Sequence, residues 1–155
     1  MKEHVIALLK ARGVTPEQIA QIAYSLQKPY YSCLELEQAL AAVDSVLSKR
    51  EVQHTLLTGI ALDVLAEVGQ LPEPLLGIVQ RDEPLFGVDE TLALGITNLY
   101  GTIGYTSFGY LDKTKPGIIG MLDGRRGGKV NTFLDDLIAG VAAAASAKLA
   151  HKLCI

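Results

Sequence analysis

Acidic side chains at three places in the second half of the chain have the types and spacing that magnesium sites use. Asp89 and Glu90 stand together, Asp112 stands alone, and Asp135 and Asp136 open an alanine-rich segment. Mg²⁺ is a hard cation that prefers oxygen ligands and keeps several waters, so carboxylates that converge from separate elements suit it. We therefore expect these five acids to form one Mg²⁺ site.

Basic residues lie between the last two acidic positions. Lys115 follows Asp112 by three residues, and the glycine-rich loop DGRRGGK contributes Arg125, Arg126 and Lys129. Phosphate oxygens bind Lys and Arg side chains and the backbone N–H groups of such loops. Because Mg²⁺ and a phosphate clamp are the minimum equipment for phosphoryl chemistry, we expect Lys115 beside the acids. Arg125, Arg126 and Lys129 are the expected substrate-binding residues at the mouth of the site.

Each of these features also has an ordinary structural explanation. Asp89 and Glu90 could simply start a helix, where negative charge is favourable. Asp112 and Lys115 could form a surface ion pair worth only about 0.2–0.5 kcal/mol. The GRRGGK segment lacks the spacing of a P-loop and could be a solvated turn.

The alanine-rich segment predicts the helix that holds the last acid pair. Alanine, leucine and lysine are strong helix formers, so we expect a helix from about Thr132 to His151, with Thr132 or Asn131 as its N-cap. A capping box needs one acid, whereas a metal site at a helix start can use two. Small side chains behind the acids would let other helices approach closely: Ala139, Gly140, Ala143, Ala144 and Ala147.

The rest of the chain also carries helical signals. The spacing of apolar residues predicts successive helices through the first eighty residues, with N-caps at Thr15 and Ser32. We expect an all-α fold, a single-domain multi-helix bundle of about six or more helices around the apolar C-terminal helix. Residues 1–60 would form the N-terminal helices, and residues 61–155 would carry the acids.

Composition narrows the function classes. The 155 residues have a net charge of −3, which gives no support to a nucleic-acid partner. The run from Leu137 to Ala147 is too short to cross a bilayer, and Lys10 and Arg12 interrupt the first apolar stretch, unlike in a signal peptide. Cys33 and Cys154 form no metal or redox motif. We expect a cytoplasmic protein, with peripheral contact at the inner face of the membrane left open.

The hydrophobic content also indicates self-association. Hydrophobic residues make up 49% of the chain, which is high for a protein without membrane spans. The aromatic and glycine-rich segment from Tyr100 to Tyr110 suits an interface. We expect a homo-oligomer, either a dimer or a tetramer.

Two sequence elements together resemble the bacterial phosphatidylglycerophosphatase A family. FGYLDKTKPGIIGMLD contains Phe-x-x-x-Asp-x-x-Lys-Pro, and GGKVNTFLDDLIAGVAAA contains Asp-Asp-x-x-Ala-Gly, in the family's order. The resemblance runs from about Ala61 to Ala147 and places the family's Asp-Glu pair at Asp89 and Glu90. The N-terminal half lacks the Gly-Thr-x-Gly-Ser element and the transmembrane helices of the membrane members. The chain therefore looks like the shorter, soluble branch of Gram-positive bacteria, sometimes labelled low-temperature-requirement proteins.

The resemblance implies a Mg²⁺-dependent phosphatase of phospholipid metabolism, which would convert phosphatidylglycerophosphate to phosphatidylglycerol. Its binding partner would be a phosphorylated small molecule or a phospholipid headgroup. Attack by water and attack by an aspartate both stay open. The alternative is a non-catalytic helical oligomer that binds an anionic ligand or partner and keeps the acids as helix caps. The implied catalytic residues are Asp112, Lys115, Asp135 and Asp136, and the implied metal ligands are Asp89, Glu90, Asp112, Asp135 and Asp136.

Overall fold

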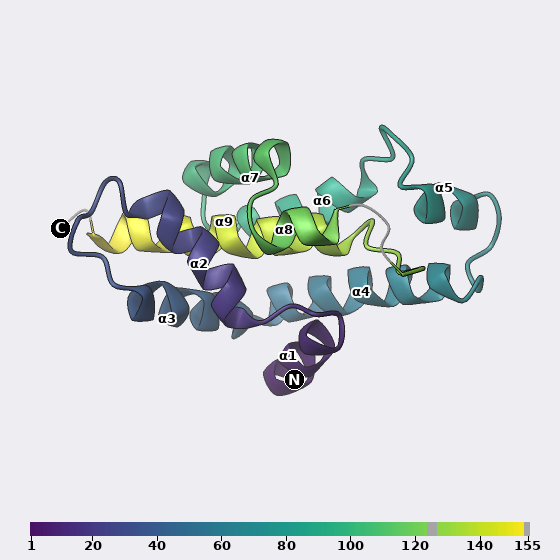
Figure 1. The fold of residues 1–155 in the computed structure, drawn as a ribbon, viewed down its shortest axis with the longest axis horizontal. Helices are drawn as coiled ribbons and strands as arrows, with labels where there is room; N and C mark the ends of the chain where they lie inside the picture. Colours follow the sequence, from purple (N-terminus) through teal and green to yellow (C-terminus); the bar gives the residue numbers. More distant parts are fainter. Residues whose placement is uncertain (124–126, 154–155) are drawn as a thin grey trace.

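The C-terminal helix α9, Leu134–Leu153, organises the fold. The computed structural model describes residues 1–123 and 127–153, and α9 runs through the middle of the molecule (Figure 1). Every residue from Thr132 to Ala147 is buried, because helices α2, α3, α4, α6, α7 and α8 all pack against α9. Up to Ala147, α9 therefore has no solvent-facing side, which explains why its sequence there is apolar almost all round. The predicted all-α fold with a central apolar C-terminal helix is confirmed.

Nine helices and no strand form within the described residues. Local signals set α2 as predicted, because Thr15 and Gln18 form a reciprocal capping box and Pro16 occupies the first turn. The bounds of the first eight helices are α1 Lys2–Ala11, α2 Pro16–Gln27, α3 Leu36–Leu47, α4 Arg50–Glu67, α5 Leu75–Arg81, α6 Val88–Thr97, α7 Thr102–Thr114 and α8 Ile118–Leu122.

The start of α3 differs from the prediction. Ser32 is not its N-cap, because the helix begins at Leu36. The side chain of Lys28 donates hydrogen bonds to the carbonyls of Ser32 and Leu34. Leu34 is also buried. These contacts hold residues 32–34 outside the helix, so α3 starts later than predicted.

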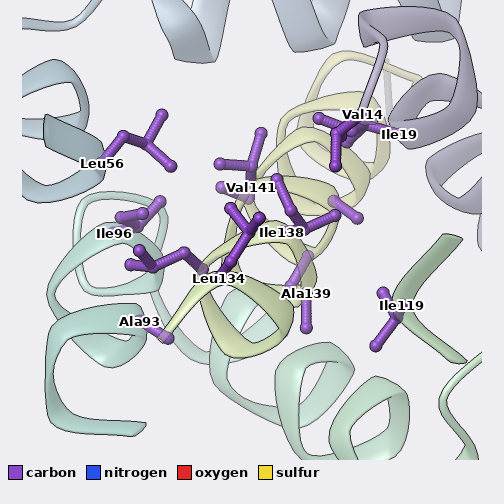
Figure 2. Packing of buried hydrophobic residues seen from close by; sticks show 14 of the residues in the cluster. Val14, Ile19, Leu56, Ala93, Ile96, Ile119, Leu134, Ile138, Ala139 and Val141 are labelled. Atoms are coloured by element: carbon purple, nitrogen blue, oxygen red, sulfur yellow. The ribbon is translucent and has the colours of Figure 1, made fainter. Parts of the chain in front are cut away.

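Large apolar side chains fill the space around α9. Figure 2 shows Ile138 and Val141 of α9 among Leu56 of α4, Ile96 of α6 and Ile119 of α8, and each is at most 1% exposed. Full burial of such a side chain contributes about 1.5–3 kcal/mol relative to exposure. This core fixes the positions of the helices that carry the predicted acids.

Two glycines allow the backbones of α7 and α9 to come into direct contact with the backbone of α6. A Cβ atom at Gly140 of α9 would lie 3.0 Å from the carbonyl oxygen of Ala93 in α6. A Cβ atom at Gly104 of α7 would lie 2.9 Å from the carbonyl oxygen of Thr97, at the end of α6. Because neither position has room for a side chain, α6, α7 and α9 meet closely.

Within residues 1–123 and 127–153, no helix is both long and apolar enough to cross a membrane.

Candidate metal and phosphate site

Four of the five predicted acids gather where α6, α7 and α9 meet. Asp89 lies in the first turn of α6, Asp112 near the end of α7, and Asp135 and Asp136 in the first turn of α9. Asp89, Asp135 and Asp136 are only 9%, 4% and 5% exposed. The four acids are close enough to interact electrostatically, because the charges of Asp135, Asp89 and Asp112 all raise the pKa of Asp136.

Lys115 provides the positive charge inside this carboxylate cluster. Its Nζ lies 3.0 Å from Asp112 Oδ1 and 3.3 Å from Asp135 Oδ2, so it joins α7 to α9. Burial alone would lower the pKa of Lys115, but the hydrogen bond with Asp112 and the charges of Asp135, Asp112 and Asp136 together raise it. Lys115 is therefore a cation at neutral pH, and its pair with Asp112 belongs to a larger network.

The backbone at Lys115 is unusual. The residue ends α7 with φ of 45° and ψ of 56°, in the left-handed region that residues other than glycine rarely adopt. Such conformations occur often at functional sites, where the surrounding structure holds them in place. Here the turn directs the lysine side chain back toward the carboxylates.

One lysine does not balance four carboxylates. Burial raises the pKa of Asp135 to about 7, although Lys115 and the backbone N–H of Asp136 oppose the shift. Burial, followed by the charges of Asp135, Asp89 and Asp112, raises the pKa of Asp136 to about 9. Burial also raises the pKa of Asp89. The cluster therefore retains protons near neutral pH, since its negative charge exceeds what Lys115 neutralises.

Carboxylate oxygens and excess negative charge are what a magnesium ion prefers, so the cluster suits this ion in donor type. Mg²⁺ in phosphate sites typically takes one or two protein carboxylates, and waters and substrate oxygens complete its octahedron. As the side chains stand, no group of three or more His, Cys, Asp or Glu residues in the described part of the chain is arranged to hold a metal. Instead, Lys115 bridges Asp112 and Asp135. An ion here would rely on a subset of the acids and on oxygens from outside the chain.

The remaining predicted residues lie apart from the cluster or cannot be placed. The side chain of Glu90 is exposed, and it is the backbone N–H of Glu90 that contacts Asp89 Oδ1, at 3.0 Å. Arg125 and Arg126 fall outside the described residues. Lys129 is exposed and lines a separate pocket beside the start of α9.

That pocket has a volume of about 230 Å³ and is mostly polar. It borders the carboxylate cluster, because Asp82 in its wall is close enough to Asp135 to raise the pKa of that residue. Two cationic side chains, Arg81 and Lys129, face it alongside hydrogen-bonding groups. The complete lining is Gln80, Arg81, Asp82, Leu122, Asp123, Lys129, Val130, Asn131 and Thr132.

Asp63 of α4 is a residue that sequence reasoning missed. It is fully buried, and its carboxylate accepts hydrogen bonds from the N–H groups of Phe133, at 3.1 Å, and Leu134, at 3.0 Å. Burial raises the pKa of Asp63 to about 7 in spite of these two hydrogen bonds. The available signal was the one acid within the apolar segment GIALDVLA.

Asp63 replaces the predicted cap of α9. Thr132 uses its hydroxyl to donate to the carbonyl of Val79, at 2.6 Å, and Asn131 donates to the carbonyl of Leu122, at 3.2 Å. Neither side chain is free for the helix start, so the prediction of a Thr132 or Asn131 cap was wrong. The first N–H groups of α9 are satisfied from α4 instead.

A partly buried ion pair fixes the segment that leads into α9. Arg12 lies 2.6 Å from Glu67 and donates to the carbonyl of Val130 and to Asn131 Oδ1, at 2.5 and 2.8 Å. Glu67 accepts from the N–H of Val130 at 2.8 Å. Val130 and Asn131 line the polar pocket, so this network holds one of its walls.

Known proteins are similar to this chain over nearly its whole length. The family model described as phosphatidylglycerophosphatase A matches residues 5–151. The chain is 48% identical to YutG of Bacillus subtilis over 152 residues, which cover 98% of this chain and 92% of YutG. The crystal structure of the low temperature requirement C protein of Listeria monocytogenes matches with a TM-score of 0.94 and 49% identity, over 97% of this chain and 95% of that one. A protein of unknown function from Bacillus stearothermophilus matches with a TM-score of 0.96 and 52% identity, over 99% and 96% of the two chains.

Proposed function

The chain belongs to the phosphatidylglycerophosphatase A family, and on this basis we propose that it is a Mg²⁺-dependent phosphatase that hydrolyses a phosphate monoester. The family makes phosphatidylglycerophosphate the first substrate to test, with phosphatidylglycerol and inorganic phosphate as products. The observation that carries the proposal is the convergence around Lys115 of buried carboxylates from α6 and α9 and the half-buried Asp112 of α7. Burying several like charges is costly unless a positively charged ligand compensates.

The proposed roles follow from position and charge. One or two of Asp89, Asp112, Asp135 and Asp136 would hold Mg²⁺, which when bound neutralises phosphate oxygens and favours attack at phosphorus. Lys115 orients Asp112 and Asp135 through its ion pairs and presents its ammonium group to a phosphate oxygen.

The nucleophile is either water or an aspartate. An acid of the cluster that does not itself bind the ion can take a proton from an attacking water; Asp135, whose pKa burial raises to about 7 in the metal-free protein, is the candidate. Direct attack by a carboxylate through an aspartyl-phosphate is the other route. Lys129 and Arg81 would contribute positive charge where the polar pocket meets the cluster.

The alternative function, a non-catalytic helical oligomer that keeps the acids as caps, has less support. Asp63 already accepts from the N–H groups of Phe133 and Leu134. The Asp135 carboxylate faces Lys115 on another element instead. Capping therefore does not account for two buried acids at the start of α9.

A phosphate-release assay tests the proposal. Purified protein is incubated with phosphatidylglycerophosphate in detergent micelles and with soluble phosphomonoesters, in Mg²⁺ or in EDTA. We expect release in Mg²⁺ only, and Asp112→Asn to reduce it by at least about 100-fold.

Asp44→Asn is the matched control. Asp44 pairs with Lys2 at 2.8 Å, much as Asp112 pairs with Lys115, but on the exposed surface. This control should retain full activity. Activity that persists in EDTA, or that survives Asp112→Asn, would contradict the proposal.

A further inference from the structure

Asp63 of α4 holds the start of α9 from outside the carboxylate cluster, and it is fully buried. Its two oxygens have separate partners, since Oδ1 accepts from the N–H of Phe133 and Oδ2 accepts from the N–H of Leu134. Asp135 and Asp136 follow Leu134 directly in the chain. Because both oxygens of Asp63 are engaged and its side chain is closed to solvent, Asp63 is not itself a ligand for an ion or a phosphate.

A distant acceptor does more for a helix start than a local cap does. Thr132 and Asn131 stand where a local cap would stand, yet both donate to carbonyls of other segments. A local cap satisfies the first N–H groups of a helix, but it leaves the helix free to slide or rotate against its neighbours. Asp63 satisfies these groups and also ties the first turn of α9 to α4.

The contact at Asp63 is one of three along the same face of α4. Gly59, Asp63 and Glu67 are four residues apart, so they lie in a row on the helix surface. Glu67 accepts from the N–H of Val130 at 2.8 Å. A Cβ atom at Gly59 would overlap Leu137 Cδ1, so α4 lies directly against the first turns of α9 there (Figure 1). Together the three contacts fix how far α9 is shifted and rotated relative to α4.

We propose that Asp63 is a positioning residue of the phosphatase site: by holding the first turn of α9 against α4, it places the carboxylates of Asp135 and Asp136 beside Lys115. This inference rests on the proposed function. Lys115 Nζ lies 3.3 Å from Asp135 Oδ2, already at the long end of a hydrogen bond. A small movement of the helix start would therefore break this contact, and a misplacement of about 1 Å can cost an active site about 100-fold in rate.

The polar pocket beside the cluster is held by other contacts. Arg12 donates to the carbonyl of Val130 and to Asn131 Oδ1, and the Thr132 hydroxyl donates to a carbonyl of α5. These three residues form one wall of the pocket. Loss of the contact at Asp63 should therefore displace the carboxylates more than the pocket wall. The expected kinetic signature is a lower kcat with a nearly unchanged KM.

Asp63→Asn tests the proposal with almost no change of volume. Asparagine keeps one acceptor oxygen, but its NH₂ group faces the second N–H, so one of the two hydrogen bonds is lost. In calorimetric titration of the metal-free protein, Mg²⁺ should bind the variant at least about tenfold more weakly than the wild type. With phosphatidylglycerophosphate in micelles and saturating Mg²⁺, kcat should fall by about 100-fold and KM should change by less than about threefold.

Gln27→Leu is the matched control. Gln27 of α2 is also buried and also bonds to α9, because its Nε2 donates to Ser146 Oγ at 2.8 Å. Ser146 comes ten residues after Asp136, about 15 Å further along the helix. Both variants remove one buried hydrogen bond to α9, so both should lower the thermal unfolding temperature by a few degrees. Only Asp63→Asn should change the Mg²⁺ affinity and kcat.

Gly59→Ala gives a second test that leaves every hydrogen bond of Asp63 in place. The added Cβ atom would lie 3.2 Å from Phe133 Cβ and overlap Leu137 Cδ1, so it pushes the start of α9 away from α4. Mg²⁺ affinity should fall here too, by about threefold to tenfold. If circular dichroism shows that Asp63→Asn does not fold, Gly59→Ala decides the matter, and an unchanged Mg²⁺ affinity would then overturn the positioning role.

The outcomes separate this inference from the proposed function. A folded Asp63→Asn protein that matches the wild type in Mg²⁺ affinity and kcat would overturn the positioning role and leave the proposed function intact. Equal losses in Gln27→Leu would also overturn it, because general destabilisation would then explain the effect. A wild type that neither binds Mg²⁺ nor releases phosphate would contradict the proposed function, and the positioning role would fall with it.

Discussion

Replacing Asp136 with asparagine should stabilise the metal-free protein at neutral pH. The pKa of Asp136 rises from 3.8 to about 9 on folding, first because of burial and then because of Asp135, Asp89 and Asp112. At pH 7 the folded protein must therefore hold a proton that the unfolded chain releases. Asparagine resembles the protonated acid in shape and has no proton to take up.

The magnitude follows from the linkage between proton binding and folding. A group whose folded pKa is raised gives stability that is fully present below its unfolded pKa and is lost as pH rises toward the folded value. For Asp136 the window runs from about pH 4 to about 9. About three pH units of this window lie below pH 7, and each is worth about 1.4 kcal/mol, so the free energy of unfolding of the variant should rise by up to about 4 kcal/mol at pH 7. Because neighbouring acids share the protons, we expect a rise of about 2–4 kcal/mol.

Urea unfolding followed by circular dichroism, in EDTA, measures this gain. With a slope of about 2 kcal/mol per molar urea, the midpoint should rise by about 1–2 M at pH 7. The difference should vanish near pH 4, where the unfolded aspartate is protonated as well. Asp44→Asn, on the exposed surface, should shift the midpoint little at either pH. A variant no more stable than the wild type at pH 7, or equally stabilised at pH 4, would refute the electrostatic reasoning.

Four other substitutions test parts of the same structure by urea unfolding. Asp63→Ala leaves two buried N–H groups without an acceptor and should cost about 2–4 kcal/mol; no loss would mean that α9 does not need this cap. Gly140→Ala forces a Cβ atom to 3.0 Å from the carbonyl of Ala93 and should cost up to about 2 kcal/mol. Gly95→Ala, where nothing lies within 4 Å, should gain about 0.5–1 kcal/mol, and equal effects at both glycines would contradict the close approach of α6. Lys115→Met should lower stability more at pH 8 than at pH 5, because ionised acids then lack their counter-ion; the reverse order would show that Lys115 does not neutralise them.

Helix positions followed from local signals where the cap lies next to the helix. Thr15, Pro16 and Gln18 act within one turn, and α2 begins where the sequence predicts. Ser32 failed as the cap of α3 because Glu35 is the N-cap, and its N–H donates to Gln38 Oε1 in a capping box three residues further on. That signal is local too, so the error lay in choosing between two candidate caps.

The start of α9, unlike that of α3, depends on a distant residue. Its acceptor, Asp63, comes from seventy residues earlier in the chain, and no local pattern links the two segments. The acid pairs, in contrast, could be picked out because their types and order resemble a family motif. Which member of the pair Asp89 and Glu90 faces inward depends on the helix face that packs, since adjacent residues lie about 100° apart around a helix. The structure buries Asp89 and exposes Glu90.

The central position of α9 has a consequence for biosynthesis. The ribosome synthesises α9 after the other eight helices of the described residues, most of which pack against it. Until residues 134–147 emerge, α2, α3, α6 and α7 have no common surface to pack on, and their apolar faces stay open to water. Folding of this chain is therefore expected to be late and concerted rather than progressive from the N-terminus. Nascent chains that stop before α9 should depend on chaperones, and pulse proteolysis of ribosome-bound chains of increasing length would reveal protection that arises abruptly once α9 is exposed.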